Sequence, residues 1–242
     1  MLRRTSEDEV KPAPADTGFS GTSAPANHTT PAQRLYARQA QQADFLTAML
    51  ADSNNFSGSD VADIAHYLCL LHGRYPGVVD HLADRHIGSD HHALFSKLAG
   101  KFATERTLLT NMTVAAGPVT SLAGEDNALT AIEQLRQAID LLARSDRDGC
   151  TLGAAAAVLC DWLSIRPALD MMLPRIGLES PIFAIADDYM QLAAIVESMT
   201  EPRQTRAVLF GIDQLFHQHD QFWLLLERRR SLRNEMLRQI GG

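Results

Sequence analysis

The chain has 242 residues, a formal net charge of −7 and a pI of about 5.7, which argues against nonspecific nucleic-acid binding because no overall positive field attracts phosphates. Hydrophobic residues make up 45% and aromatic residues 6%, so the chain can bury a sizeable core and favours helices over strands. No apolar run approaches the roughly 20 residues of a transmembrane helix, and the N-terminus lacks the apolar segment of a signal peptide. We therefore expect a soluble, cytoplasmic protein that binds neither nucleic acid nor membrane.

The composition changes near residue 29. Residues 1–29 are rich in Pro, Ser, Thr and Gly and offer little to bury, so we expect a disordered N-terminal tail. Residues 30–240 alternate apolar helical patterns with short breaks, which predicts a single-domain, all-α bundle of about seven to nine helices around two buried central helices. The three cysteines form no CxxC pair, and their odd number on apolar segments favours reduced thiols in the cytoplasm.

The first predicted helix starts with Thr30 as its N-cap and Pro31 at the first helical position, and it runs to about residue 50. After a loop, residues 59–72 form a helical stretch that is apolar nearly all round, which is typical of an interior helix. The stretch stops at Gly73, and His72 shares a face with its core residues. Two interpretations of His72 follow: it bonds the last free carbonyls of the helix, or it points inward as a ligand or proton carrier.

Two further helices are predicted over residues 91–115 and 126–143. Glu105 is the exception on the first of them, a carboxylate in line with leucine and phenylalanine side chains. The second central helix covers residues 151–165 and consists mostly of small and apolar side chains. Pro167 predicts a boundary directly after it, since a proline inside a helix removes a hydrogen bond.

The last two predicted helices cover residues 181–199 and 202–237. Each carries an ionisable residue on its apolar face, Glu197 in the first helix and His219 in the second. The longer helix ends in a run rich in arginine, which favours a solvated basic end because cations suit a helix C-terminus. The alternative interpretation of this end is a docking patch for an acidic partner.

Four ionisable residues therefore lie on predicted apolar faces of four different helices: His72, Glu105, Glu197 and His219. Burying an unpaired charge is costly, so we expect these residues to meet one another, an arginine or a metal ion. Carboxylates and imidazoles that converge inside a helical bundle form di-iron carboxylate sites, but no glutamate here is followed three residues later by histidine. The structural alternative is a polar layer that only fixes the register of the helices. The sequence identifies neither a metal nor a cofactor.

Three segments carry a resemblance to a known group of proteins: HYLCLLHGRYPGVVDH, RDGCTLGAAAAVLCDW and LFGIDQLFHQHDQFWLLLERR. They resemble an uncharacterised all-helical bacterial protein family of unknown function. The resemblance spans most of the chain after the tail and implies an intact helical domain, but it carries no activity and no catalytic residue. A looser likeness to ferritin-like and haem-oxygenase-like bundles depends only on helix number and inward His and Glu residues, and fold analogy does not define function.

The sequence contains no recognised catalytic motif, so it does not decide whether the protein is an enzyme. The first functional hypothesis is a non-catalytic binding or regulatory scaffold that acts with an unidentified protein partner or as a homodimer. The alternative is a metal- or small-ligand-binding bundle of the oxidase type, in which the four inward residues form the site.

Overall fold

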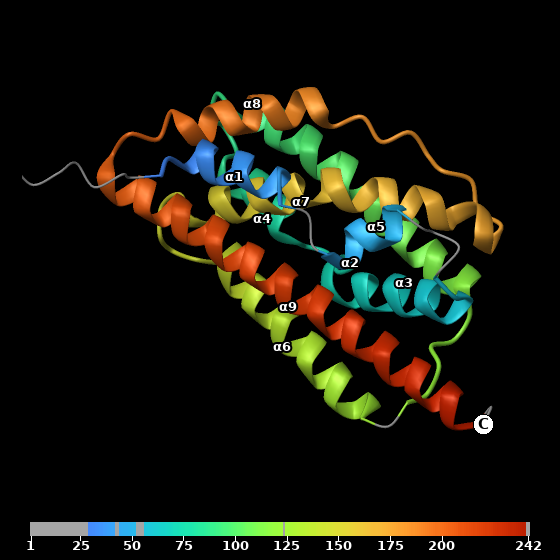
Figure 1. Ribbon diagram of the computed structural model, residues 1–242. Coiled ribbons are helices and arrows are strands. Elements are labelled where there is room, and N and C mark those ends of the chain that lie inside the picture. The colour runs from blue at the N-terminus through green and yellow to red at the C-terminus, as the bar shows by residue number, and fades with distance from the viewer. Residues whose placement is uncertain (1–28, 42–43, 52–55, 123, 241–242) are drawn as a thin grey trace, which may run out of the picture.

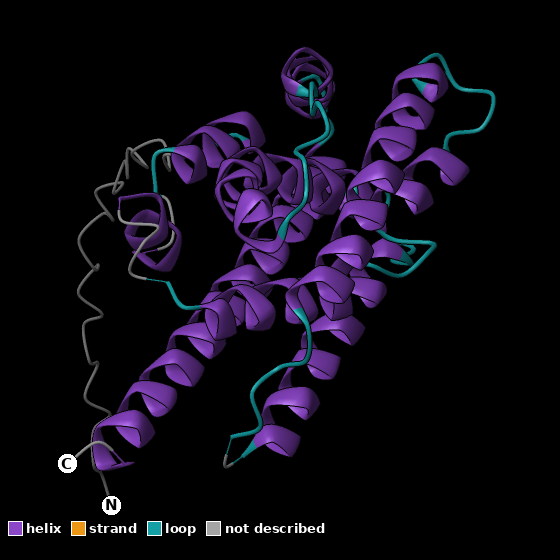
Figure 2. Cartoon of the chain, turned by 90° about the vertical axis from the view of Figure 1, so that its right-hand side faces the viewer, coloured by secondary structure: helices purple, strands orange, loops and turns teal. Residues whose placement is uncertain are grey.

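The computed structural model describes residues 29–41, 44–51, 56–122 and 124–240. Over these ranges the chain forms nine α-helices and no strand (Figure 1), and the view turned by 90° shows helices joined by loops throughout (Figure 2). The prediction of an all-α, single-domain bundle is therefore confirmed. The predicted disordered tail lies, apart from Thr29, outside the described residues.

The helices in chain order are α1 (Pro31–Gln39), α2 (Asp44–Ala51), α3 (Gly58–His72), α4 (Val78–Arg85), α5 (His92–Ala116), α6 (Glu125–Ala143), α7 (Cys150–Met172), α8 (Ala186–Glu197) and α9 (Pro202–Ile240), with a short 3-10 helix, η2 (Leu173–Ile176), after α7.

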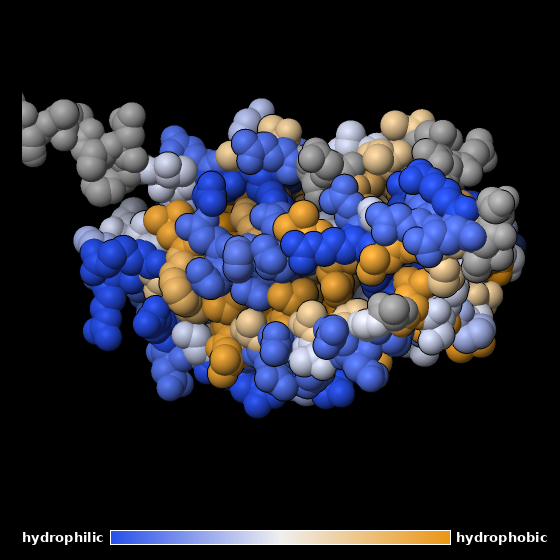
Figure 3. All heavy atoms as spheres, turned by 60° about the horizontal axis from the view of Figure 1, so that its bottom comes forward, coloured by the Kyte–Doolittle hydropathy of each residue, from blue (hydrophilic) through white to orange (hydrophobic). Residues whose placement is uncertain are grey.

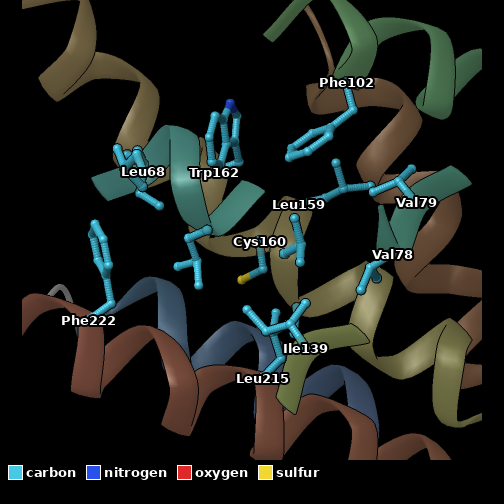
Figure 4. Packing of buried hydrophobic residues seen from close by; sticks show 14 of the residues in the cluster. Leu68, Val78, Val79, Phe102, Ile139, Leu159, Cys160, Trp162, Leu215 and Phe222 are labelled. Carbon is cyan, nitrogen blue, oxygen red and sulfur yellow. The ribbon is translucent and has the colours of Figure 1, made fainter. Parts of the chain in front are cut away.

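Helix α7 is the centre of the fold and packs against α1, α2, α4, α6, α8 and α9 (Figure 1). Residues 150–162 are all buried, because their mostly small side chains let neighbouring helices approach from every side. Figure 4 shows Trp162 of α7 beside Phe102 of α5 in this core, with their ring centroids 4.9 Å apart. Helix α3 packs against α5, α6 and α9 and is buried over most of its length. Both predicted central helices are thus interior.

Helices α7 and α9 cross with their backbones almost in contact. A Cβ atom added at Gly153 of α7 would collide with the backbone of Val208 of α9, and one added at Gly211 of α9 would collide with the backbone of Cys150 of α7. Only glycine leaves room for this approach. This close approach lies in the first turns of α7 and the first third of α9, and Asp161 and His219 meet further along the same two helices.

The predicted boundary at Pro167 is wrong, because α7 continues through Pro167 to Met172. Ala168, Leu169 and Met172 extend the buried face beyond the proline, and their packing outweighs the hydrogen bond that the proline removes. As a result, the segment Cys150–Ile176 is long and apolar enough to cross a membrane by length and composition alone, which the sequence pattern did not predict. Within its most apolar window 83% is buried inside the protein, as in the core helix of a globular fold.

Two other predicted helices differ from the structure. The first, expected over residues 30–50, is interrupted between α1 and α2, and the glutamine-rich sequence there offers no apolar side chain larger than alanine. The helix expected over residues 181–199 begins only at Ala186. Arg166 donates a hydrogen bond to the backbone carbonyl of Pro181 at 2.6 Å, an acceptor that the first turn of a helix starting at Pro181 would use for the N–H of residue 185.

The arginine-rich end of α9 is only partly solvated, which corrects the sequence-based interpretation. Arg229 and Arg233 are 3% and 4% exposed and pair with Asp60 and Asp63 in the first turns of α3. Arg229 Nη2 lies 3.1 Å from Asp63 Oδ1, and Arg233 Nη1 lies 2.8 Å from Asp63 Oδ2. We call these four residues the arginine–aspartate cluster. It fastens the start of α3 to the C-terminal part of α9.

The surface also carries apolar side chains between the charged ones. On α9, Phe210, Leu224 and Leu232 are exposed, and the face shown in Figure 3 has hydrophobic patches among hydrophilic residues. Isolated exposed apolar residues are normal for a globular protein. Their spread along one long helix nevertheless leaves that helix with a partly apolar outer face.

Candidate functional site

His72 and His219 meet in the interior of the bundle. His72 is the last residue of α3 and is followed by the C-cap Gly73. His219 lies midway along α9. Their Nε2 atoms are 2.9 Å apart, which is within hydrogen-bond distance. His72 is 7% exposed and His219 is 1% exposed. Of the two interpretations of His72, the inward orientation is the one that the structure contains.

A carboxylate and an arginine extend this pair toward the surface. His219 Nδ1 lies 2.8 Å from Asp161 Oδ2, and Asp161 accepts two hydrogen bonds from the Arg38 guanidinium at 2.8 and 3.0 Å. Arg38 also forms an ion pair with Asp220 at 2.7 Å. We call the series Arg38, Asp161, His219 and His72 the histidine chain. It links α1, α7, α9 and α3 in one continuous set of contacts.

The charges of the histidine chain follow from its surroundings. Burial by itself would raise the pKa of Asp161, but the hydrogen bond from His219 and the Arg38 charge together lower that pKa below its ordinary value. Asp161 is therefore ionised and can only accept hydrogen bonds, so His219 donates its Nδ1–H. Burial, and secondarily the neighbouring His219, lowers the pKa of His72 well below its ordinary value, so His72 is neutral near pH 7.

Glu105 lies on the other side of Trp162 from the histidine pair. It is 1% exposed and accepts hydrogen bonds from Trp162 Nε1 and Arg166 Nη1, each at 2.9 Å. The Trp162 ring stands edge-on to the His72 ring, with centroids 5.7 Å apart. Burial raises the pKa of Glu105, and the hydrogen bond from Trp162 and the Arg166 charge oppose that rise. Glu105 thus meets an arginine, one of the partners expected for it.

Glu197 does not join the other three residues. It is exposed at the end of α8, and its Oε2 accepts a hydrogen bond from the backbone N–H of Ala32 at 3.2 Å. A carboxylate in that position stabilises the positively polarised N-terminus of α1. The structure thus brings His72 and His219 together, places Glu105 across an indole from them and leaves Glu197 at the surface.

A metal centre needs several donors around one point. Among the described residues no group of three or more His, Cys, Asp or Glu side chains is arranged to hold a metal ion. His219 does have one feature of metal-binding histidines, since its Nδ1 is fixed by a carboxylate while Nε2 points elsewhere. In this structure that Nε2 faces His72.

Sequence reasoning missed Asp161, Trp162, Arg166 and Arg38 as members of these networks. Asp161 and Trp162 carried a usable signal, because they are polar groups inside an otherwise apolar buried helix, and buried polar groups need partners. Arg166 follows one helical turn after Trp162, on the same face. Arg38 carried no such signal, because it lies on α1 among other polar side chains.

A small cavity adjoins the histidine pair. It has a volume of about 20 Å³ and is lined by His72 and Phe102 together with Arg136 and Asp140 of α6. This volume holds roughly one water molecule and leaves no room for an organic substrate. The cavity therefore cannot admit a larger reactant without rearrangement.

The fold and these contacts define an all-α bundle whose interior contains paired charges and a histidine pair. A family model described as "Family of unknown function (DUF6975)" matches residues 36–234, and the chain belongs to that family. The predicted membership of a helical family of unknown function is thereby confirmed. Comparisons with curated proteins and with solved structures gave no match.

Proposed function

We propose that this protein is a soluble, cytoplasmic, non-catalytic binding or regulatory scaffold. The observation that supports the proposal is the pairing of its buried charges. Six carboxylates are buried among the described residues, and each forms an ion pair with an arginine or lysine of the same chain. They are Asp60, Asp63, Asp80, Glu105, Asp161 and Asp188. Buried pairs of this kind fix which helices lie side by side, so these residues have a structural role.

A groove at one end of the bundle offers a place for a partner. It lies between the start of α1, the end of α8 and the start of α9, and has a volume of about 840 Å³. Pro31, Met199 and Leu209 contribute apolar surface to its lining. Two charges of each sign also line it, those of Arg34, Arg206, Glu197 and Asp213. This chemistry suits a segment of another protein that inserts an apolar side chain and carries flanking charges of both signs.

Site-directed photo-crosslinking in the cells of origin tests the binding role. A photoreactive residue in place of Leu209 should capture one specific protein, and the same residue in place of Ile182, which is 95% exposed and outside the groove, should not. Leu209→Glu should abolish the complex while the thermal stability stays unchanged. A complex that survives Leu209→Glu, or equal crosslinking from both positions, would contradict binding at the groove.

The alternative, a metal- or small-ligand-binding bundle, has one observation in its favour, the carboxylate that backs His219. Metal analysis of protein purified without a His-tag separates the two hypotheses. Stoichiometric iron or manganese that is lost in both Glu105→Ala and His219→Ala would favour the alternative. A metal-free protein that forms the crosslinked complex would favour the scaffold.

A further inference from the structure

The histidine chain has a defined direction of hydrogen bonding. Because Asp161 can only accept, His219 donates from Nδ1. A neutral His219 then has a lone pair on Nε2, so the hydrogen bond across the 2.9 Å gap comes from His72 Nε2–H. The Nδ1 atom of a neutral His72 is consequently an unprotonated acceptor. The two imidazoles hold opposite tautomers, and each tautomer is imposed by the neighbour on one side.

His72 is also the member of the pair that solvent can reach. It lines the cavity of about 20 Å³, and the Arg136–Asp140 ion pair of α6 lies on the wall of that cavity. His219, which is 1% exposed, is enclosed by His72 on one side and by Asp161 on the other. A proton from solvent therefore arrives at His72 first.

We propose that the His72–His219 pair, which joins α3 to α9, is a buried proton-binding site that takes up a single proton through the adjacent cavity. The inference does not depend on the proposed binding role.

The uptake requires one proton from solvent and one transfer inside the pair. The solvent proton binds the lone pair of His72 Nδ1, and the proton on His72 Nε2 crosses to His219 Nε2. His72 is then neutral in its other tautomer, and His219 is an imidazolium beside the carboxylate of Asp161. The positive charge thus lies on His219, which has Asp161 as its counter-ion, although the proton from solvent bound first to His72, which has none.

The surrounding charges allow one proton and oppose a second. Asp161 faces His219 directly, but it already neutralises Arg38 of α1, whose guanidinium also pairs with Asp220. The neighbouring carboxylate of α5, Glu105, is separated from His72 by Trp162 and is paired with Arg166. Arg74 and Arg136 on the cavity side add positive charge, opposed by Asp140 and by Glu133, which both pair with Arg136. Two imidazolium ions 2.9 Å apart in this setting repel strongly, and a second proton would separate α3 from α9.

Nuclear magnetic resonance of the full-length chain with ¹⁵N-labelled histidine tests the proposal. Ring nitrogen shifts report tautomer and protonation, and through-bond correlation from the backbone assigns the rings without variants. At pH 8 we expect Nδ1–H on His219 and Nε2–H on His72. On titration to pH 5 the two rings should change together, with one midpoint and a combined amplitude of one proton. His217, which lies on the same helix and is exposed, serves as the single-ring reference for the amplitude.

Three outcomes would overturn the proposal. The first is a pair that takes up two protons, each with the amplitude seen for His217. The second is a pair that stays neutral until the whole chain unfolds. The third is the same tautomer on both rings at pH 8. A His217→Gln variant should leave the titration of the pair unchanged, and coupling to that exposed histidine would equally contradict a closed two-residue site.

Discussion

Helix α3 contacts α9 at both of its ends, through ion pairs at one end and through a histidine–histidine hydrogen bond at the other. At its start the arginine–aspartate cluster joins Asp60 and Asp63 to the arginines of α9. At its end His72 meets His219. Arginine stays charged at every pH at which proteins fold, whereas histidine gains or loses its proton near neutrality. One helix therefore has a permanent attachment and a titratable attachment about a dozen residues apart.

Burial alone therefore does not decide the role of a charged group. In the cluster every charge has a partner of opposite sign, so the attachment is electrically balanced. In the histidine chain one carboxylate serves both Arg38 and His219, and the charge balance depends on where a proton sits. We expect variants at the two ends of α3 to differ both in size of effect and in pH dependence.

The largest expected effect is at the permanent end. Asp63→Ala removes the carboxylate shared by Arg229 and Arg233 and leaves buried positive charge underneutralised, so it should lower the free energy of unfolding by about 3–5 kcal/mol. Urea denaturation measures the change. Asp126→Ala, an exposed carboxylate on α6, is the matched control and should lie within about 0.5 kcal/mol of wild type. A loss at Asp63 as small as that of the control would remove the distinction between the two ends.

A smaller effect is expected in the histidine chain. Asp161→Asn keeps the shape of the side chain but replaces the charged acceptor of Arg38 and His219, which should cost about 2 kcal/mol. Asp213→Asn breaks the half-exposed ion pair with Arg34 and should cost at most about 1 kcal/mol. Thermal denaturation of both variants gives the comparison. Equal losses would indicate that Asp161 contributes no more than a surface carboxylate.

The pH dependence separates the two ends most directly. Because the pKa of folded His72 is lowered, the unfolded chain binds a proton at a higher pH than the folded chain does. Stability is therefore retained above pH 6.5 and falls as the pH drops below it, by about 1 kcal/mol over the first pH unit. Denaturation curves between pH 7.5 and 5.5 should show a shallower fall in His72→Gln than in wild type. The His217→Gln variant is the control and should show the wild-type fall. If His72→Gln showed the same fall, the loss of stability at low pH would come from groups other than His72.

The smallest effect is expected outside both regions. Glu197→Gln removes the charge that faces the N-terminus of α1 but keeps a side-chain acceptor for the N–H of Ala32, so we expect a loss of about 0.5 kcal/mol or less. Differential scanning calorimetry measures it. A loss near 2 kcal/mol would place Glu197 among the buried groups after all.

The sequence predicted the fold class because the apolar faces repeat with the helical period over long segments. It also predicted that His72, Glu105 and His219 are buried, as the structure shows, because each interrupts an otherwise apolar stripe. Glu197 has the same pattern and is exposed. Its stripe belongs to a helix at the edge of the bundle, which buries a narrower face than an interior helix does.

The partners of the buried groups could not be predicted in the same way. Periodicity gives the face of a residue on its own helix, but not the rotation or the height of the helix opposite. Arg229 and Arg233 illustrate this limit, because a cationic helix end is ordinarily solvated and only the start of α3 beside it makes these side chains buried. Asp161 was visible in the sequence as an interruption, but its connection with His219 depends on how α7 crosses α9.

That crossing has a consequence for other members of the family. Gly153 and Gly211 each face the backbone of the opposite helix, so enlarging one cannot be compensated by shrinking the other. A relative with a larger side chain at either position must slide or tilt α9 along α7, and His219 would then move out of register with Asp161. Substitutions at these two glycines should therefore be accompanied by the loss of the histidine pair, and aligned sequences offer a simple way to look for this association.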